Sequence, residues 1–397
     1  MMKLKSLYPV LCLMVGVCML SGCIEEFEAD IPEENTDLLV VEGTICSNKL
    51  NQFILSRTQS VYSSDKTLMA RGAKVSVRGS DGSVFDTQET DGGYICWIGA
   101  LVPDVEYHLH IEIDGEVYES EPQKPLRTEG IAEAIGVQNT PESSIDVLVT
   151  PDAPFEPGKV NYYSWTYEET WEVHSDYTTH IYFDTEKKMA VFKADQFPER
   201  GWKDATDSTI MVGTSSSYDG QHIQKLKIYD IDRSSERLWH RYSCLLHQRA
   251  ISKAEYEYEL ARIQASSEMG GLFTPLPSAL PTNIRCLTSH KHVIGFVGCS
   301  LNTTDYRLFL NAKDFSIHRT PIKDARTWFD DTSLADCFQM VAEGLYLCEW
   351  EDKRMEPGGK LRTAWAPERL LDVRYKGAYI IKPVFWTLDE DDSEQQS

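Results

Sequence analysis

The fold is decided by residues 72–118, which read GAKVSVRGSDGSVFDTQETDGGYICWIGALVPDVEYHLHIEIDGEVY. Apolar and polar side chains alternate over 73–78 and again over 107–113, the pattern of strands with one buried face. Aspartate-glycine pairs lie between these runs and supply the positive φ angles that tight hairpin turns require. These turns are Asp81-Gly82, Asp91-Gly92-Gly93 and Asp114-Gly115.

Two further apolar runs extend this pattern toward the start of the chain, at 38–43 and 52–56. Pro122 and Pro125 then mark a join after it. Short strands separated by turns at this spacing predict a β-sandwich of immunoglobulin-like size over residues 37–128.

The second half predicts a larger β-rich domain over 129–387, with one helix over Ser252–Met269, so the fold class is mainly β. Glu255 follows Ser252 at the spacing of a capping box, in which each side chain satisfies a free backbone N–H. Ala254, Tyr258, Ala261 and Ala265 recur at helical spacing among polar residues. This spacing predicts one apolar stripe along the helix. Three prolines within Leu272–Asn283 then predict an extended crossing.

The first residues have the features of a bacterial lipoprotein signal. Lys3 and Lys5 precede an apolar run over 7–19, which is shorter than the roughly 20 residues that span a bilayer. Leu20, Ser21 and Gly22 follow this run and immediately precede Cys23. We therefore expect a signal peptide over 1–22 and a lipid on Cys23.

The segment after Cys23 predicts both a flexible tether and the location of the protein in the cell envelope. Residues 23–36 are acidic and short of apolar side chains, as in a flexible linker. Ile24 is not the aspartate that retains some lipoproteins in the inner membrane, and Glu25, Glu26 and Glu28 resemble short surface-export signals. The expected location is the outer membrane, with the protein lipid-anchored through Cys23 and facing the cell exterior.

The charge of the chain excludes several classes of partner. The 397 residues carry 39 Lys and Arg against 62 Asp and Glu, a net charge of −23. Removal of residues 1–22 takes away two lysines and leaves −25. Nucleic acid is excluded as a partner, because its phosphates are bound chiefly by Lys and Arg. Adsorption to anionic lipid headgroups is disfavoured for the same reason. Residues 388–397 form an acidic tail.

Seven cysteines follow Cys23, so at least one of them is a free thiol. Two pairs are candidates for disulfides by their spacing, Cys286–Cys299 and Cys337–Cys348. The alternative is that all seven are small buried thiols. No Cys-x-x-Cys occurs, which argues against a thiol-redox or zinc-ribbon role.

Four aromatic side chains share one face if residues 161–173 form a single strand, because alternate side chains point the same way. They are Tyr163, Trp165, Tyr167 and Trp171. Such a face is either a stacking platform for a sugar or aromatic ligand, or the core of a sandwich. Glu168 and Glu169 are adjacent and so point in opposite directions, which excludes them as a catalytic carboxylate pair.

No catalytic residue, metal site or cofactor is predicted. His108 and His110 share a strand face, but a zinc site needs three or four converging ligands. The sequence has no G-x-S-x-G, no G-x-x-x-x-G-K-[ST] and no G-x-G-x-x-G.

Several phrases resemble known families. The stretch opening this section resembles the transthyretin-like or carboxypeptidase-regulatory-like modules of bacterial surface proteins, which serve as structural or spacer units. The phrases YYSWTYEETWEV (162–173), RYSCLLHQRAISKAEYEYELAR (241–262) and HVIGFVGCS (292–300) are similar to the family called domain of unknown function 4249. GGLFTPLPSALPTNI (270–284) and GAYIIKPVFW (377–386) extend that resemblance.

That resemblance implies an outer-membrane lipoprotein of no established activity, near TonB-dependent receptors. Family members usually have Asp-Pro-x-Pro where this chain has Thr274-Pro275-Leu276-Pro277. We therefore expect a non-catalytic, surface-exposed binding or accessory lipoprotein beside a TonB-dependent transporter in nutrient uptake, with no ligand specified. The alternatives are an envelope structural or adhesin-like protein, and an unrecognised hydrolase with a polar pocket in the second domain.

Overall fold

The computed structural model describes six stretches of the chain: residues 37–58, 68–154, 156–218, 222–268, 281–320 and 323–386. The predicted signal peptide, Cys23, the tether over 23–36 and the acidic tail over 388–397 lie outside the described residues. Most of the predicted proline-rich crossing does too. Within the described stretches no helix has the length and apolar character needed to cross a membrane.

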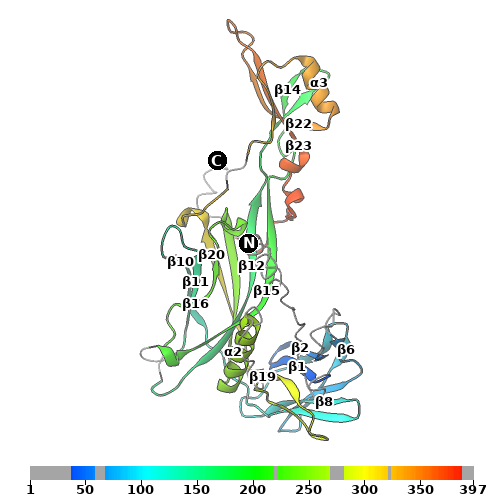
Figure 1. The fold of residues 1–397 in the computed structure, drawn as a ribbon, viewed down its shortest axis with the longest axis vertical. Coiled ribbons are helices and arrows are strands. Elements are labelled where there is room, and N and C mark those ends of the chain that lie inside the picture. Colours follow the sequence, from blue (N-terminus) through cyan, green and yellow to red (C-terminus); the bar gives the residue numbers. More distant parts are fainter. Residues whose placement is uncertain are drawn as a thin grey trace, which may run out of the picture.

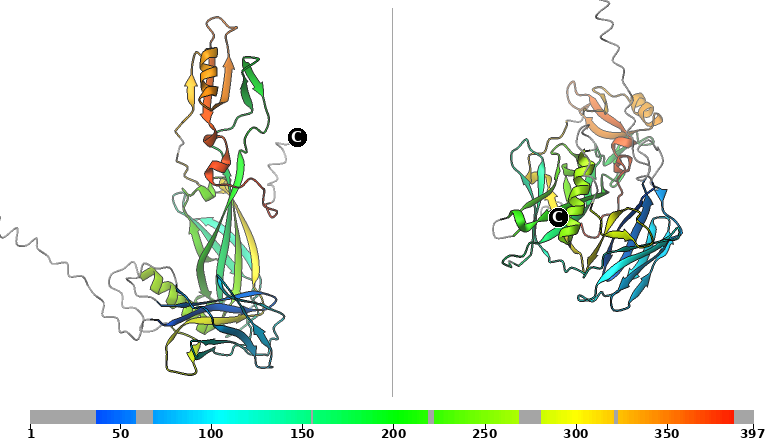
Figure 2. Two further views of the ribbon diagram at one scale, coloured as in Figure 1. Left: turned by 90° about the vertical axis from the view of Figure 1, so that its right-hand side faces the viewer. Right: turned by 60° about the horizontal axis from the view of Figure 1, so that its bottom comes forward.

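The described chain is elongated and has three parts along its length (Figures 1 and 2). A β-sandwich lies at one end, a β-body of long strands lies in the middle, and a small distal module lies at the other end. Strands provide most of the regular structure, so the prediction of a mainly β protein is confirmed.

The sandwich contains two sheets packed around one core. The first has the strand order β19-β1-β2-β7-β6, with β3 paired to β2. Its strands are β1 (Leu39–Cys46), β2 (Lys49–Arg57), β3 (Leu68–Met69), β6 (Gln88–Thr90), β7 (Gly93–Ile98) and β19 (Val293–Ser300). The second has the order β18-β9-β8-β4-β5. Its strands are β4 (Lys74–Gly79), β5 (Val84–Asp86), β8 (Tyr107–Ile113), β9 (Glu116–Ser120) and β18 (Ile284–Cys286).

The predicted hairpin chemistry is present at the turn between β8 and β9. Asp114 and Gly115 both have positive φ angles, 52° and 77°, and Ile113 pairs with Glu116 across them. Two consecutive residues with positive φ make the mirror-image turn that matches strand twist. The strands expected over 38–43, 52–56, 73–78 and 107–113 are confirmed as β1, β2, β4 and β8.

The sandwich takes two strands from the region that the sequence assigned to the second domain. β19 pairs parallel with β1, and β18 pairs antiparallel with β9. Gly295 lies opposite Val41 with a φ of 127°, and a Cβ there would lie 1.9 Å from the Val41 carbonyl oxygen. The chain therefore leaves the sandwich after β9, returns for β18 and β19, and leaves again before β20, so everything between β9 and β18 is an insertion into the sandwich.

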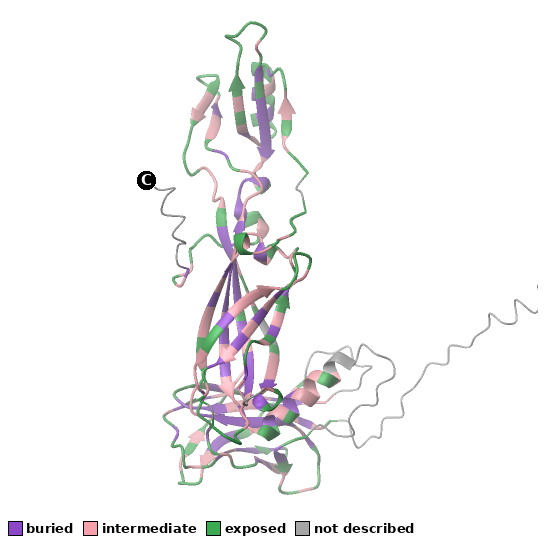
Figure 3. Ribbon diagram, turned by 90° about the vertical axis from the view of Figure 1, so that its left-hand side faces the viewer, coloured by how far each residue is buried: buried purple, intermediate pink, exposed green. Residues whose placement is uncertain are grey.

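The β-body consists of two sheets that enclose the second large core. The first sheet has the order β10-β11-β16 and the second the order β15-β12-β17-β20. The strands are β10 (Ile131–Gln138), β11 (Ile145–Pro151), β12 (Tyr162–His174), β15 (Arg200–Thr214), β16 (Leu226–Ile231), β17 (Arg241–Ala250) and β20 (Thr304–Asn311). Buried residues concentrate between these sheets (Figure 3).

The distal module is built from two segments, one between β12 and β15 and one that follows β20. It contains two small sheets and a helix around its own core. Its elements are β13 (Ile181–Asp184), β14 (Met189–Phe192), β21 (Thr327–Phe329), α3 (Leu334–Ala342), β22 (Leu345–Asp352) and β23 (Leu361–Pro367). Short 3-10 turns complete the chain: η3 (Ser215–Ser217), η5 (Glu236–Leu238), η6 (Ala312–Asp314), η7 (Glu368–Leu370) and η8 (Val373–Lys376).

The predicted helix is confirmed as α2 (Lys253–Glu268), although its packing differs from the prediction. Ser252 Oγ accepts from the Glu255 N–H, but the Glu255 side chain binds Arg249 instead of closing the capping box. Ala254, expected in the apolar stripe, is exposed, while Glu255 and Tyr258 are buried. The contact of the helix with the sandwich and the body is therefore partly an ion pair, because Arg249 lies beneath the helix and binds its buried carboxylate.

Candidate functional site

The four aromatic residues of β12 lie in the core of the body, so the prediction of a stacking platform is wrong. Tyr163, Trp165, Tyr167 and Trp171 are 1%, 1%, 7% and 6% exposed. Trp165 Nε1 donates to Gln248 Oε1 over 2.9 Å, and Tyr167 stacks on Tyr229 with the ring centroids 4.0 Å apart. The first sheet of the body, β10-β11-β16, covers this face, and none of these four rings is left exposed for a ligand.

The two glutamates of the same strand point in opposite directions, as predicted. Glu169 is buried, accepts from the Tyr242 hydroxyl over 2.8 Å and lies 3.2 Å from Arg237 Nη1. Glu168 is exposed and lies 3.6 Å from His247 Nε2. They belong to separate environments on the two faces of the sheet.

The histidine pair on β8 is engaged by carboxylates. His110 Nδ1 lies 2.9 Å from Glu119 Oε1, and His110 Nε2 lies 3.3 Å from Glu112 Oε1. His108 Nε2 lies 3.8 Å from Glu119. Across the described part of the chain, no three His, Cys, Asp or Glu side chains are grouped closely enough to hold a metal ion.

The two predicted disulfides are not formed, since all seven cysteines of the described residues are free thiols. Cys286 lies on β18 and Cys299 on β19, which belong to opposite sheets of the sandwich. Packed sheets stand about 10 Å apart, whereas a disulfide needs Cβ atoms about 4 Å apart. Cys337, on α3, packs in the core of the distal module, while Cys348, on β22, packs in a separate cluster with Tyr346.

Native-state thiol labelling should distinguish the seven cysteines. Burial raises the pKa of Cys286, but hydrogen bonds with Ser289 and Thr288 outweigh this and lower the pKa below its ordinary value. Burial raises the pKa of Cys96 to about 11, and those of Cys244 and Cys299 to about 12. We expect a maleimide to modify Cys286 at least about tenfold faster than the others, because only the thiolate reacts. Peptide mass spectrometry measures the order in which the cysteines are modified. If the two cysteines of a predicted pair react with maleimide only after a reductant is added, the disulfide prediction is restored.

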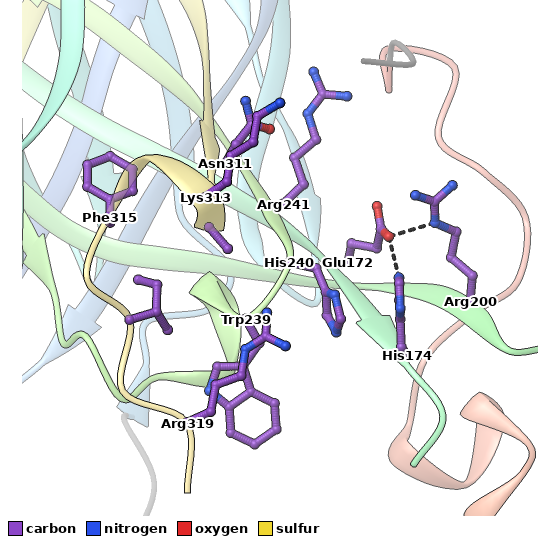
Figure 4. A pocket seen from close by; sticks show the side chains of 12 residues that line it. Glu172, His174, Arg200, Trp239, His240, Arg241, Asn311, Lys313, Phe315 and Arg319 are labelled. Carbon is purple, nitrogen blue, oxygen red and sulfur yellow. Dashed lines mark hydrogen bonds and ion pairs between the residues drawn. The ribbon is translucent and has the colours of Figure 1, made fainter. Parts of the chain in front are cut away.

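The candidate site is a pocket at the end of the body nearest the distal module, with a volume of about 600 Å³ (Figure 4). Residues from β12, β15, β17 and β20 meet there with the segment that follows β20. The lining residues are Glu172, His174, Arg200, Trp239, His240, Arg241, Asn311, Ala312, Lys313, Phe315, Ile317 and Arg319.

Glu172 anchors one wall of the pocket. Its Oε1 accepts from Arg200 Nε over 2.6 Å and from His174 Nε2 over 2.5 Å (Figure 4). Burial raises the pKa of Glu172, but the hydrogen bonds from His174 and Arg200 outweigh it and lower the pKa below its usual value. The carboxylate is therefore ionised at neutral pH and holds the ends of β12 and β15 together.

His240 stacks on His174, with the ring centroids 3.6 Å apart and the planes 20° from parallel. Burial is the largest cause that lowers the pKa of His240, and His174, Arg319 and Arg200 lower it further, to about 3. The His240 imidazole is therefore neutral at physiological pH and can donate or accept one hydrogen bond.

The opposite wall is formed by the start of β17 and the end of β20, which pair at Arg241 and Asn311. The guanidinium of Arg241 lies over the ring of Phe309 at 4.4 Å and over that of Trp386 at 5.7 Å. Asn311 Oδ1 is buried and has no hydrogen-bond partner among the described residues. The ring contacts hold the Arg241 guanidinium at the pocket wall, and the strand pairing places the Asn311 amide beside it.

The described lining of the pocket is rich in cations. Among the described residues it includes Arg200, Arg241, Lys313 and Arg319, and one carboxylate, that of Glu172. The chain as a whole has a net charge of −23.

Sequence reasoning missed this pocket because its residues come from separate segments between 172 and 319. The available signal was a local excess of basic residues in an acidic chain, as in His240-Arg241 and His318-Arg319. Neither dipeptide has the spacing of a known ligand motif.

The fold and the pocket define a β-rich protein of three modules in a row, with a cation-lined pocket where the second meets the third. The chain belongs to the family of domain of unknown function 4249, whose family model matches residues 24–305. The resemblance to this family noted in the sequence is thereby confirmed over these residues.

Other comparisons add little. None of the curated proteins matches the chain. A crystal structure of a DUF4785 family protein from Legionella pneumophila is 10% identical, with a TM-score of 0.15. The match covers 50% of this chain and 54% of that protein, about half of each. A likeness of this size carries no argument about fold or function.

Proposed function

We propose that the protein is a non-catalytic lipoprotein of the outer membrane, held by lipid on Cys23, exposed at the cell surface, and acting beside a TonB-dependent transporter. The observation that carries the proposal is the linear order of the modules from the lipid end. Asp37, the first described residue, belongs to the sandwich end of the molecule, and the distal module lies at the opposite end (Figure 2).

The length of the tether supports this arrangement. Cys23 precedes Asp37 by 14 positions, so a fully extended tether reaches at most about 50 Å. The sandwich then stays near the membrane while the body and the distal module project from it. Each buried methylene of the lipid contributes about 0.8 kcal/mol, so several acyl chains hold such a protein firmly.

The composition of the pocket supports binding over catalysis. Among the described residues that line it, the one carboxylate is held by Arg200 and His174, and none has a hydroxyl or thiol side chain. A hydrolase of the predicted kind would need a second acid, or a serine beside a histidine, in the same cavity.

Replacement of Cys23 by serine should abolish metabolic labelling with palmitate. It should also move the protein from the membrane fraction to the soluble fraction, because the acyl chains supply the membrane affinity. Cys18→Ser, within the same leader, is the matched control and should leave both labelling and partition unchanged. Retention of Cys23→Ser protein in the membrane fraction would refute the anchor.

Partnership is tested by affinity purification of the anchored protein after mild detergent extraction, followed by mass spectrometry. We expect a TonB-dependent transporter to be recovered with the native chain. Protease shaving of intact cells should cleave the body while a periplasmic marker stays intact. Recovery without any transporter across several growth conditions favours the envelope structural alternative.

A further inference from the structure

We propose that the cleft between the sandwich and the body binds an uncharged sugar, whose hydroxyls are held by β12 and β17 and whose ring lies against Trp97. The cleft lies near Ser164, at the start of β12, whereas the pocket of Figure 4 lies at the other end of that strand, near Glu172. This inference goes beyond the proposed function, because it names a ligand and holds with or without the lipid and the transporter.

Three adjoining cavities form the cleft, with volumes of about 420, 420 and 270 Å³. All three are lined by Thr44 of β1 and Arg249 of β17, so they meet around these two residues. The sandwich forms one wall and the body the other, and α2 closes one end (Figure 1). Each of the two larger cavities falls in the size range of small-molecule sites.

The outer face of β12 presents hydroxyl groups to the cleft. Ser164 and Thr166 point away from the aromatic row of the same strand, and they pair across the sheet with Arg249 and His247. Ser164 is 6% exposed, and its hydroxyl has no hydrogen-bond partner among the described residues. A nearly buried hydroxyl without a partner costs free energy, which a hydrogen bond from a ligand would recover.

Further hydroxyls around the cleft share this property. In the part of the chain that the structure describes, none of them has a side-chain hydrogen bond. They are Thr44, Thr166 and Thr303. A hydroxyl both donates and accepts, as the hydroxyls of a sugar do, so the two sets complement each other.

Arg249 adds a fixed donor at the point where the cavities meet. Its Nη2 donates to Glu255 Oε1 over 2.5 Å, while its Nη1 is buried without a hydrogen-bond partner among the described residues. Gly298 makes room for this group, because a Cβ there would lie 2.9 Å from Nη1. A guanidinium that is already held by a carboxylate loses little freedom when a ligand accepts from it.

The charges around the cleft favour an uncharged ligand. Besides the pair of Arg249 with Glu255, Arg262 holds Glu259 over 2.8 Å. His247 lies 3.6 Å from Glu168. Because these lining groups offset one another, the cleft has little net charge with which to attract an anion or a cation.

An apolar surface flanks the hydroxyls. Leu50 lines the smallest cavity and pairs with Trp97 across β2 and β7. Paired side chains lie on the same face with their Cβ atoms about 5 Å apart, so the indole stands beside the cleft. Leu50 and Trp97 are 55% and 65% exposed. An exposed indole offers a flat apolar surface on which a sugar ring can pack.

Calorimetric titration of the purified protein tests the inference, in lauryldimethylamine oxide because that detergent has no sugar headgroup. The probes are glucose, N-acetylglucosamine, maltose, cellobiose and lactose, with glucose 6-phosphate as the charged probe and cyclohexanol as a ring with a single hydroxyl. We expect at least one of the uncharged sugars to bind saturably and at least about tenfold more tightly than cyclohexanol. Absence of saturable binding of all the uncharged sugars would refute the inference, and tighter binding of glucose 6-phosphate than of glucose would overturn the uncharged class.

Two hydroxyl variants locate the sugar on β12. Ser164→Ala and Thr166→Val should each weaken binding of the best sugar about threefold to tenfold, as expected for loss of one hydrogen bond. Both should leave thermal unfolding unchanged, because neither hydroxyl has a protein partner among the described residues. Thr327→Val, which removes an exposed hydroxyl in the distal module, is the matched control and should leave the affinity unchanged.

A third variant tests the apolar flank. Trp97→Ala should weaken binding of the same sugar about fivefold, through loss of the ring contact. Phe192→Ala removes an aromatic side chain of the distal module that is 71% exposed, and it should have no effect on the affinity. Unchanged affinity in Ser164→Ala, Thr166→Val and Trp97→Ala together would place the sugar elsewhere and overturn the assignment of the cleft.

Discussion

Replacement of Gly295 by alanine should detach β19 from the sandwich and destabilise the protein by roughly 3 kcal/mol or more. A Cβ at this position would lie 1.9 Å from the Val41 carbonyl oxygen, where β1 and β19 pair. The φ angle of 127° is also strained for any residue with a side chain. Moving β19 outward would relieve the clash of the Cβ with Val41. The same movement would break the hydrogen bonds that join β19 to β1.

Thermal unfolding and amide hydrogen exchange measure this effect. Protection should fall along the β1 edge that faces β19, while the amides of the distal module keep theirs. Gly99→Ala is the matched control, since a Cβ at Gly99 meets no atom within 4 Å and its φ is not in the positive region. A melting temperature of Gly295→Ala equal to that of Gly99→Ala would contradict the parallel pairing.

Replacement of Arg249 by methionine should destabilise the protein by about 3–5 kcal/mol, the usual cost of leaving a buried charge unpaired. The guanidinium lies beneath α2 against Glu255, whose side chain is 5% exposed. Although burial lowers the pKa of Arg249, the Glu255 carboxylate outweighs it and raises the pKa, so the ion pair stays charged. Loss of the cation leaves Glu255 beside a second buried carboxylate, Glu259.

A double variant separates the pair from the packing. Arg249→Met with Glu255→Leu should recover most of the lost stability, because the remaining buried carboxylate, Glu259, keeps its partner Arg262. The control is Lys253→Met on the same helix, which removes an exposed pair with Glu257 and should cost less than about 0.5 kcal/mol. Urea unfolding measures all four chains; a double variant no more stable than Arg249→Met would show that Arg249 acts through packing alone.

Local features of the fold were predictable because they depend on local chemistry. Alternation located β4 and β8, the Asp114-Gly115 pair located its hairpin, and Ser252 located the start of α2. Pairing between distant segments was not predictable. Nothing near β1 or β19 specifies that they lie side by side, since the same apolar pattern suits many neighbours.

The same limit explains the errors at the sites. The alternating aromatic residues of β12 would form the same sequence pattern on a face exposed to solvent as on a face covered by a second sheet. In the structure the sheet β10-β11-β16 covers this face. Cysteine spacing likewise cannot tell two strands of one hairpin from strands of opposite sheets. The cationic pocket is a product of topology alone, because it forms where the ends of several strands converge.

The closure of the sandwich by β19 also sets an order in time. During synthesis β1 emerges early, but its parallel partner appears only after the whole insertion from β10 to α2 has been made. Until then one edge of the first sheet presents unpaired backbone groups, and exposed edges of this kind promote association between chains. The long sequence separation of the contact also slows folding. A nascent chain of this protein therefore depends on protection of that edge until Ser300 has been added, long after the other strands of the first sheet have been made.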